Sequence, residues 1–376
     1  MNTNNSSEYF ISPHPGEILK GEIEEHGLSQ RELASAIGKS APMVNGILNG
    51  SKDITVEIAI LLEAALPGGM KAKDWLRLQN EHDLDKKRSD EMIQSRKTAI
   101  EIWNYLRENS NLNALRRRLD FGNDFVSNIS MVMDTLGISS LTDLKNKLET
   151  SKCYFKKSDK VQTDSSNLFS WTVIVKHASN LQKLNAPFVS DRIPELIKKL
   201  NEIFYNNKSV IEKTEKVLNE YGIKFIHSEK RLDKVPVDGY SFWIGENPTI
   251  VSTQRMNRID NFAFTIMHEL GHIKLHLTKD SEIEYMDVDG VIMNTNPQEE
   301  EANKYATCSL WSDESPEIIF SEIENPYASA KILNAIARRK RMNVGIVTGQ
   351  YQFFCSQKQL VKNSYAICRD LISHIG

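Results

Sequence analysis

The chain has 376 residues, 40% of them hydrophobic and 26% charged, with a formal net charge of −3. This is ordinary globular composition, long enough for roughly two or three domains, and the charge excludes a global attraction to nucleic acid or membranes. No run of about 18 apolar residues occurs and the first residues are polar, so neither a transmembrane helix nor a signal peptide is expected. The cysteines are widely spaced, which predicts free thiols in a reducing cytoplasm; they are Cys153, Cys308, Cys355 and Cys368.

Residues 1–13 are polar and are expected to be disordered. A domain of five helices is predicted over residues 14–85, because glycines and N-capping serines interrupt its apolar pattern at short intervals. The expected helices are 17–26, 30–37, 41–49, 56–65 and a fifth that carries Trp75. Two short helices joined by a tight turn inside such a unit form a helix-turn-helix.

The segment SQRELASAIGKSAPMVNGILNG resembles the Xre/Cro-type DNA-binding domain. With the flanking segments HPGEILKGEIEEHGLS and KDWLRLQNEHDL, residues 14–84 resemble HigA-type antitoxins more closely. The resemblance implies that the third helix enters the major groove of an operator with its N-terminal end first, and that a HigB-type toxin is a partner. A single helix-turn-helix on an acidic body also suggests a homodimer that reads two half-sites.

The candidate DNA-contacting residues lie at the start of the second helix and along the third. Amide side chains such as Asn45 can pair with adenine, and Pro42 can contact a thymine methyl group. Lysines are suited to phosphates. The full set is Gln30, Lys39, Ser40, Ala41, Pro42, Asn45, Asn49 and Lys52.

The charge of this domain leaves an alternative open. Residues 1–85 contain 7 Lys and Arg against 13 Asp and Glu, which disfavours non-specific DNA binding and fits a helical interaction module equally well. Residues 39–52, however, contain two lysines and no acid. Because the local field at the contact surface matters more than the domain total, we favour DNA binding.

The middle of the chain, residues 86–205, carries no chemical motif. A charged stretch at 83–96 is expected to extend a helix or form a linker, residues 97–150 have helical periodicity, and residues 151–167 are polar and are expected to form a loop. Further helices are predicted at 171–184 and 193–206. Its position between two domains suggests a helical linker or sensing segment.

The last domain, residues 206–376, mixes helices and strands. A helix at 209–221 is followed by a strand at 222–226 and by a strand pair at 239–243 and 249–252, joined across 245–248. A helix over 262–277 follows, for which Asp260 is the expected N-cap.

This helix contains the motif H-E-x-x-H, formed by His268, Glu269 and His272. Residues four apart lie on one helix face, so both imidazoles can hold a Zn²⁺ ion while the glutamate acts as general base. The metal lowers the pKa of a bound water toward neutrality. The alternative is a core helix whose histidines are satisfied by hydrogen bonds.

A catalytic zinc site needs a third protein ligand. A histidine ten residues after the first would supply it in one class of protease, but that position is Thr278. His276 lies one turn beyond His272 and is expected to be a helix-end residue rather than a ligand.

A second helix, capped by Asn296, offers a carboxylate instead. Glu299 is the preferred ligand and Glu301 the second choice. Asn303 lies one turn after Glu299 and is expected to orient a ligand from behind.

The segments VDGYSFWIGENPTIVST, FTIMHELGHIKLH and EEEANKYA, in this order, resemble the ImmA/IrrE family of metallopeptidase-like proteins over about residues 217–352. The resemblance implies an α+β, zincin-like domain of the gluzincin type, in which a small mixed sheet packs on the active-site helices. One of the paired strands would line the cleft edge, where an extended substrate can add. Zinc would be held by His268, His272 and Glu299, with Glu269 as the base. Residues 308–312, CSLWS, depart from the apolar ending usual in this family.

Two functions follow. The first is a cytoplasmic DNA-binding regulator of a toxin–antitoxin, stress-response or phage-related operon, whose zinc endopeptidase cleaves a repressor, a partner such as a toxin, or itself. Tyr240, Tyr285 and Tyr305 are its candidate oxyanion donors. The second is a HigA-type antitoxin and autorepressor that neutralises a HigB-type toxin, with the zinc domain as a sensor or scaffold.

Overall fold

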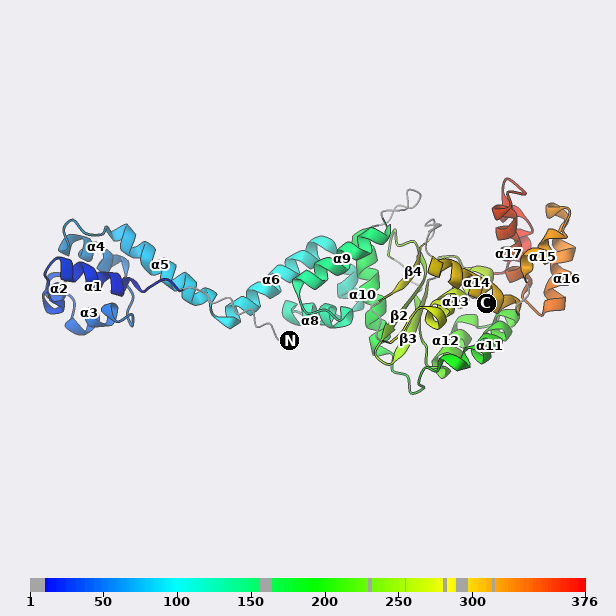
Figure 1. Ribbon diagram of the computed structural model, residues 1–376, viewed down its shortest axis with the longest axis horizontal. Coiled ribbons are helices and arrows are strands. Elements are labelled where there is room, and N and C mark those ends of the chain that lie inside the picture. The colour runs from blue at the N-terminus through cyan, green and yellow to red at the C-terminus, as the bar shows by residue number, and fades with distance from the viewer. Residues whose placement is uncertain are drawn as a thin grey trace. The chain divides into compact units, whose positions relative to one another are not determined.

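The computed structural model describes residues 11–155, 164–228, 232–253, 255–279, 283–288, 297–312 and 315–376, with the backbone alone described at 150–155 and 328. It divides into two compact units, residues 1–102 and 103–376 (Figure 1). The units meet within α6 (Glu91–Asn109). The finer division predicted from the sequence, at 13/14, 85/86 and 205/206, stays a prediction.

The N-terminal unit confirms the predicted five-helix architecture. Its helices are α1 (Pro15–Glu25), α2 (Gln30–Ala36), α3 (Ala41–Leu48), α4 (Val56–Ala65) and α5 (Ala72–Arg88). Side-chain caps start four of them: the His14 ring accepts from the Gly16 amide in α1, Ser29 forms a capping box with Glu32, and Ser40 and Thr55 accept hydrogen bonds from the first turns of α3 and α4. Their apolar faces share one core, which includes Leu33, Val44, Ile47, Leu62 and Trp75.

Order begins before residue 14. Residues 1–10 lie outside the described residues, but the hydroxyl of Ser12 donates to the Asp85 carboxylate at 2.6 Å, and the Ser12 carbonyl lies 2.7 Å from Nδ1 of His82. The end of the stretch expected to be disordered therefore packs on α5.

The C-terminal unit opens with helices. These are α7 (Leu112–Arg118), α8 (Phe125–Leu136), α9 (Leu141–Phe155) and α10 (Ser165–Leu181). The predicted loop at 151–167 is wrong at both ends, because α9 continues to Phe155 and Asp164 caps α10 at Ser165. Residues 156–163 lie outside the described residues. Among the described residues, no helix combines the length and apolar character that crossing a bilayer requires.

A four-stranded mixed sheet and further helices complete the unit. The elements are 3₁₀ turn η1 (Ser190–Arg192), α11 (Ile193–Asn206), α12 (Val210–Glu220), β1 (Lys224–Ser228), β2 (Val237–Ile244), β3 (Asn247–Thr253), α13 (Ile259–Leu275), β4 (Tyr285–Val288), α14 (Pro297–Trp311), α15 (Pro316–Ser321), η2 (Pro326–Ala328), α16 (Ala330–Lys340), α17 (Val344–Gln357), η3 (Ser364–Ala366) and η4 (Arg369–Leu371). The strand order is β1-β3-β2-β4. β3 runs parallel to β1, and β2 runs antiparallel to both β3 and β4.

The strand order corrects two expectations. The turn between β2 and β3 is Gly245-Glu246 alone, since Asn247 and Pro248 already pair with β2. Neither β2 nor β3 lies at an edge of the described sheet; β4, which the sequence did not predict, takes that place.

Helices cover both faces of the sheet, with α10 on one and α13 on the other (Figure 1). β2 alternates between them: Tyr240 and Phe242 pack toward Trp171 of α10, whereas Gly239 faces α13. The sheet is therefore buried on both sides, and α13 lies in the core of the C-terminal unit rather than on the surface of that unit.

A partly buried charge cluster joins the helices to the sheet. The Glu284 carboxylate, just before β4, accepts hydrogen bonds from Lys176 of α10 at 2.5 Å, from Lys147 of α9 at 2.9 Å, and from the hydroxyl of Tyr240. Burial by itself would raise the pKa of Glu284, but the two lysines outweigh this effect and lower the pKa to about 2. Lys176 is only 4% exposed, so it depends on this counter-charge.

We predict that Glu284→Gln lowers the free energy of unfolding of the C-terminal unit by about 3 kcal/mol at pH 7, because it leaves a buried ammonium without its partner. The folded pKa of Glu284 lies below the ordinary 4.5, so its stabilisation is present above pH 4.5 and is lost as the pH falls toward 2. Urea unfolding followed by tryptophan fluorescence at pH 7 and pH 3 measures both effects. Glu195→Gln, at an exposed pair with Lys199, is the control. Equal stability of the two variants at pH 7 would contradict the prediction.

Candidate metal centre and candidate nucleic-acid interface

The H-E-x-x-H motif lies in the most buried part of α13. His268, Glu269 and His272 are 3%, 0% and 1% exposed. The start of this helix differs from the prediction: Arg258 occupies the N-cap position, and Asp260 lies in the first turn, where it pairs with Arg258 at 2.6 Å. Asp260 also faces Gly349 of α17, where a Cβ atom would overlap the carboxylate, so tertiary packing takes the side chain away from capping.

α13 and α14 pack unusually closely at Gly271. A Cβ atom at this glycine would lie 3.2 Å from the Tyr305 ring and 3.3 Å from the Cα of Ala302, which is tighter than ordinary van der Waals contact. Ala302 is itself fully buried. Two small residues therefore let the backbones approach, and this approach brings Glu299 of α14 to the two histidines. The predicted cap Asn296 lies outside the described residues.

Three potential ligand atoms form a small triangle. The Nε2 atoms of His268 and His272 are 3.0 Å apart, and Oε2 of Glu299 lies 3.2 Å and 3.5 Å from them. Zinc ligands sit about 2.1 Å from the ion, so two corners of a tetrahedral site lie about 3.4 Å apart. The triangle thus has the size of three corners around one zinc ion. Within the described part of the chain, it is the one cluster of this kind.

The hydrogen bonds behind the histidines direct their lone pairs into this triangle. Nδ1 of His268 donates to the amide oxygen of Asn303 at 3.0 Å, as expected for a residue that orients a ligand. Nδ1 of His272 lies 3.0 Å from Nδ1 of His276, whose Nε2 lies 2.9 Å from Oε2 of Glu301. With each Nδ1 engaged as a donor, each ring in its neutral form presents Nε2 as an acceptor. Three electron-rich atoms then converge, an arrangement that a cation stabilises.

The protonation equilibria agree with this arrangement. Burial, helped by the neighbouring His268 and His276, lowers the pKa of His272 to about 4, so the ring is neutral at pH 7. Burial would raise the pKa of Glu299, but its close contacts with His268 and His272 outweigh this effect and lower the pKa to about 2. Neutral imidazoles and an ionised carboxylate are the forms that bind a metal ion.

Glu269 projects from the same helix toward β2. A Cβ atom at Gly239 would overlap its carboxylate, so only glycine leaves room for this side chain. No local pattern in the segment VDGYSF marks Gly239 as a site residue, because its significance depends on which face of β2 meets α13.

The structure separates the three candidate oxyanion tyrosines. The hydroxyl of Tyr240 donates to Glu284 on the α10 side of the sheet, opposite the face that α13 covers. Tyr305 packs against Gly271 between the two helices. Tyr285 of β4 stacks on the His272 ring, with centroids 4.0 Å apart and planes 13° from parallel, and is the tyrosine placed beside the metal cluster.

The candidate DNA-contacting residues share the surface around α3. Seven of the eight are exposed: Gln30, Ser40, Ala41, Pro42, Asn45, Asn49 and Lys52. Lys39 is half-buried and pairs with Glu57 at 2.8 Å, so its charge is partly compensated. The Asn49 amide donates to Asn45 at 3.1 Å, and Ser40 caps α3. This surface is thus polar, except at the start of α3, where Ala41 and Pro42 are apolar.

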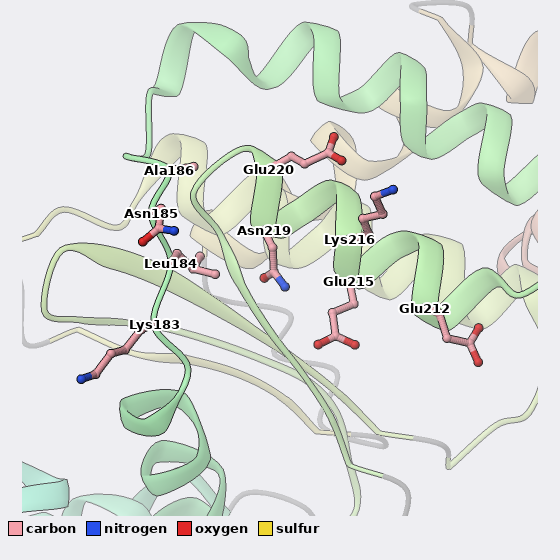
Figure 2. Close-up of a pocket in the computed structure, with 9 residues that line it drawn as sticks. All are labelled: Lys183, Leu184, Asn185, Ala186, Glu212, Glu215, Lys216, Asn219 and Glu220. Carbon is pink, nitrogen blue, oxygen red and sulfur yellow. The ribbon is translucent and has the colours of Figure 1, made fainter.

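A separate depression lies between α12 and the segment that follows α10 (Figure 2). It is open, and Figure 2 shows that its charged groups point in different directions: Lys183 turns outward on one side, while Glu215 and Glu220 leave α12 in opposite directions. No group of side chains converges there as at the metal cluster, so we assign no chemistry to it.

The fold and the cluster define a helix-turn-helix regulator joined to a metallopeptidase-like domain. Family profiles agree, since residues 19–70 match the helix-turn-helix family and residues 218–328 match the IrrE N-terminal-like domain. The chain therefore belongs to the Xre/Cro-type helix-turn-helix proteins and carries an ImmA/IrrE-like domain.

Similar proteins are found for the N-terminal unit. The chain is 34% identical over 68 residues to an uncharacterized HTH-type transcriptional regulator, YddM, of Escherichia coli (strain K12), covering 18% of this chain and 70% of that protein. It is 31% identical over 72 residues to virulence-associated protein A′ of Dichelobacter nodosus, covering 19% of this chain and 62% of that protein.

Two solved structures of antitoxins are similar to this chain. One is an addiction module antidote protein of the HigA family from Coxiella burnetii, with 31% identity and a TM-score of 0.21, covering 23% of this chain and 95% of that one. The other is Pseudomonas aeruginosa antitoxin HigA with the higBA promoter, with 37% identity and a TM-score of 0.19, covering 20% of this chain and 80% of that one.

Proposed function

We propose that this protein is a cytoplasmic, operator-binding regulator whose C-terminal domain is a zinc-dependent endopeptidase that cleaves a repressor, a partner protein or the chain itself. The observation that carries the proposal is the convergence of His268, His272 and Glu299 on one point, with Glu269 one residue after the first histidine. His268, His272 and Glu299 would hold the ion, leaving a fourth position open. Asn303 would keep His268 in the required tautomer.

The chain's own residues supply the remaining steps of peptide hydrolysis. When bound, Zn²⁺ supplies a Lewis acid that polarises the scissile carbonyl and makes water more acidic. Glu269 takes a proton from the attacking water as the oxygen bonds to the carbonyl carbon, and then delivers it to the nitrogen as the C–N bond breaks. Tyr285, beside His272, is our candidate for the donor to the developing oxyanion.

The edge strand provides a place for the substrate. β4 ends the described sheet beyond β2 and carries Tyr285, which stacks on His272. An extended peptide can add to such an edge by backbone hydrogen bonds, which would bring it past the metal cluster. A protein segment without regular structure therefore suits the site better than a small molecule does.

A second candidate is a HigA-type antitoxin and autorepressor that binds a HigB-type toxin, with the zinc domain as a sensor or scaffold. The sequence of residues 14–84, which resembles HigA-type antitoxins, favours it. Both candidates share a homodimer on operator DNA, and they differ in whether a peptide bond is broken.

We predict that Glu269→Gln abolishes proteolysis while zinc content is retained, because the substitution removes the base and none of the three ligands. Cells that express the wild type, Glu269→Gln or the exposed control Glu322→Gln would be compared by quantitative N-terminal proteomics. New N-termini, on another protein or on this chain, are expected with the wild type and the control and not with Glu269→Gln. Identical N-termini in all three, together with a small protein co-purifying with each, would contradict proteolysis and support the antitoxin function.

We also predict that Asn45→Ala weakens specific DNA binding by about 10- to 100-fold, since a bidentate base contact is worth about 1–3 kcal/mol. The probe is duplex DNA selected by the wild-type protein from a random pool, and affinity is measured by fluorescence anisotropy at fixed salt. Asn80→Ala, an exposed asparagine on α5, is the matched control. If Asn45→Ala and Asn80→Ala bind this DNA equally well, α3 is not the reading helix.

A further inference from the structure

A hydrogen-bonded chain leads from the metal-facing His272 to the protein surface. Nδ1 of His272 lies 3.0 Å from Nδ1 of His276, and Nε2 of His276 lies 2.9 Å from Oε2 of Glu301. His276 follows the last residue of α13 and its side chain is 5% exposed, whereas Glu301 belongs to α14 and its side chain is 61% exposed. The chain thus links the same two helices that supply the candidate ligands.

The carboxylate sets the direction of the protons along this chain. A carboxylate only accepts hydrogen bonds, so Nε2 of His276 must carry the hydrogen that points at Glu301. In the neutral ring, Nδ1 of His276 is then an acceptor, and it must receive its hydrogen from Nδ1 of His272. Nε2 of His272 is left with a lone pair, which faces His268 and Glu299.

We propose that His276 and Glu301 are positioning residues of the metal centre, which hold His272 in its metal-binding tautomer and strengthen zinc binding. The inference rests on the proposed zinc site. Neither His276 nor Glu301 contacts the Nε2 or Oε2 atoms that would bind the ion. A carboxylate behind an imidazole makes that imidazole a better ligand. His276 transmits the effect of Glu301 over one additional ring.

The two histidine ligands are thereby held differently. His268 is backed by the neutral amide of Asn303, and His272 by an imidazole with a carboxylate behind it. Tyr285 restricts His272 further, because its ring stacks on the His272 ring and its centroid lies 5.4 Å from that of the His276 ring. Removal of the His276 hydrogen bonds would free His272 to adopt the other tautomer, in which Nε2 carries a hydrogen and cannot bind zinc.

The sequence pattern explains why these residues are not ligands themselves. His276 lies one turn past His272 along α13, so its Nδ1 reaches the back of the His272 ring rather than the triangle. Glu301 lies two residues after Glu299 and leaves α14 in another direction, toward His276. Glu301, the second choice of ligand from the sequence, therefore contacts His276 and not the candidate ligand atoms.

The test is the zinc affinity of the full-length protein, measured by competition with a chromophoric chelator. His276→Phe keeps a ring of similar size but can neither accept from His272 nor donate to Glu301, and should weaken zinc binding by about 10- to 100-fold. His276→Gln offers an amide oxygen and an amide N–H at this place and should restore most of the affinity. Glu301→Ala should weaken binding less than His276→Phe does, and Glu300→Ala, an exposed neighbour on α14, should change nothing.

The visible spectrum of the Co²⁺-loaded protein gives a second measurement. The ligand-field bands should shift in His276→Phe and stay unchanged in Glu300→Ala. Wild-type zinc affinity in His276→Phe, whether or not His276→Gln keeps it, would show that only the packing of the ring matters and would overturn the inference. Failure of the wild type to bind zinc would overturn the proposed function instead.

Discussion

The close contact between α13 and α14 is the constraint on which the C-terminal unit depends. The motif on α13 places two imidazoles on one face, but two imidazoles make an incomplete site. Gly271 and Ala302 remove the side-chain bulk that would otherwise separate the helices, and Glu299 then lies within hydrogen-bonding distance of His268. A mixed sheet supports α13 from the other side, and Gly239 is the point at which β2 makes room for Glu269. The site therefore depends on small residues as much as on its ligands.

Burial gives these polar residues their chemical properties. An isolated histidine in water is half-protonated near neutral pH, whereas desolvation keeps His272 neutral well below pH 7. The cost of burying such groups is offset by the hydrogen bond that each ring donates from Nδ1, to Asn303 from His268 and to His276 from His272. The same principle applies on the opposite face of the sheet, where Lys176 is buried only because Glu284 accompanies it.

The N-terminal unit combines a surface suited to DNA with an acidic body. Its α3 presents exposed amides and an apolar tip, and Lys39, the cation nearest the start of that helix, is paired with Glu57. A domain with this charge should rely on specific contacts more than on phosphate attraction.

Local patterns predicted the parts of this structure that local interactions decide. The helix bounds of the first unit follow capping serines and glycines, and α4 matches its predicted range. Features set by contacts distant in the sequence were not predictable. β4 is a strand of four residues whose sequence has no clear alternation. Asp260 does not cap α13, because its carboxylate pairs with Arg258. The contact between His276 and Glu301 depends on how α13 and α14 are aligned along each other, which the sequence alone does not give.

At the metal cluster, the residue types indicated candidate ligands, and the tertiary structure separates these candidates by position. Glu299 and Glu301 are the same residue type and lie two positions apart, so composition could not separate them. The structure does: Glu299 faces both imidazoles, and Glu301 faces His276. The preference for Glu299 rested on its helical relation to Asn303, which the His268 hydrogen bond supports.

X-ray absorption at the zinc edge of the purified, zinc-supplied protein would show whether His268, His272 and Glu299 hold one zinc ion. We expect one zinc per chain, with a first shell of nitrogen and oxygen atoms at about 2.0–2.1 Å and the outer-shell scattering of two imidazoles. Glu299→Gln should reduce the zinc content, while Glu300→Gln should not. A sulfur shell at about 2.3 Å, or a chain that takes up no zinc, would show that these three residues do not form a zinc site.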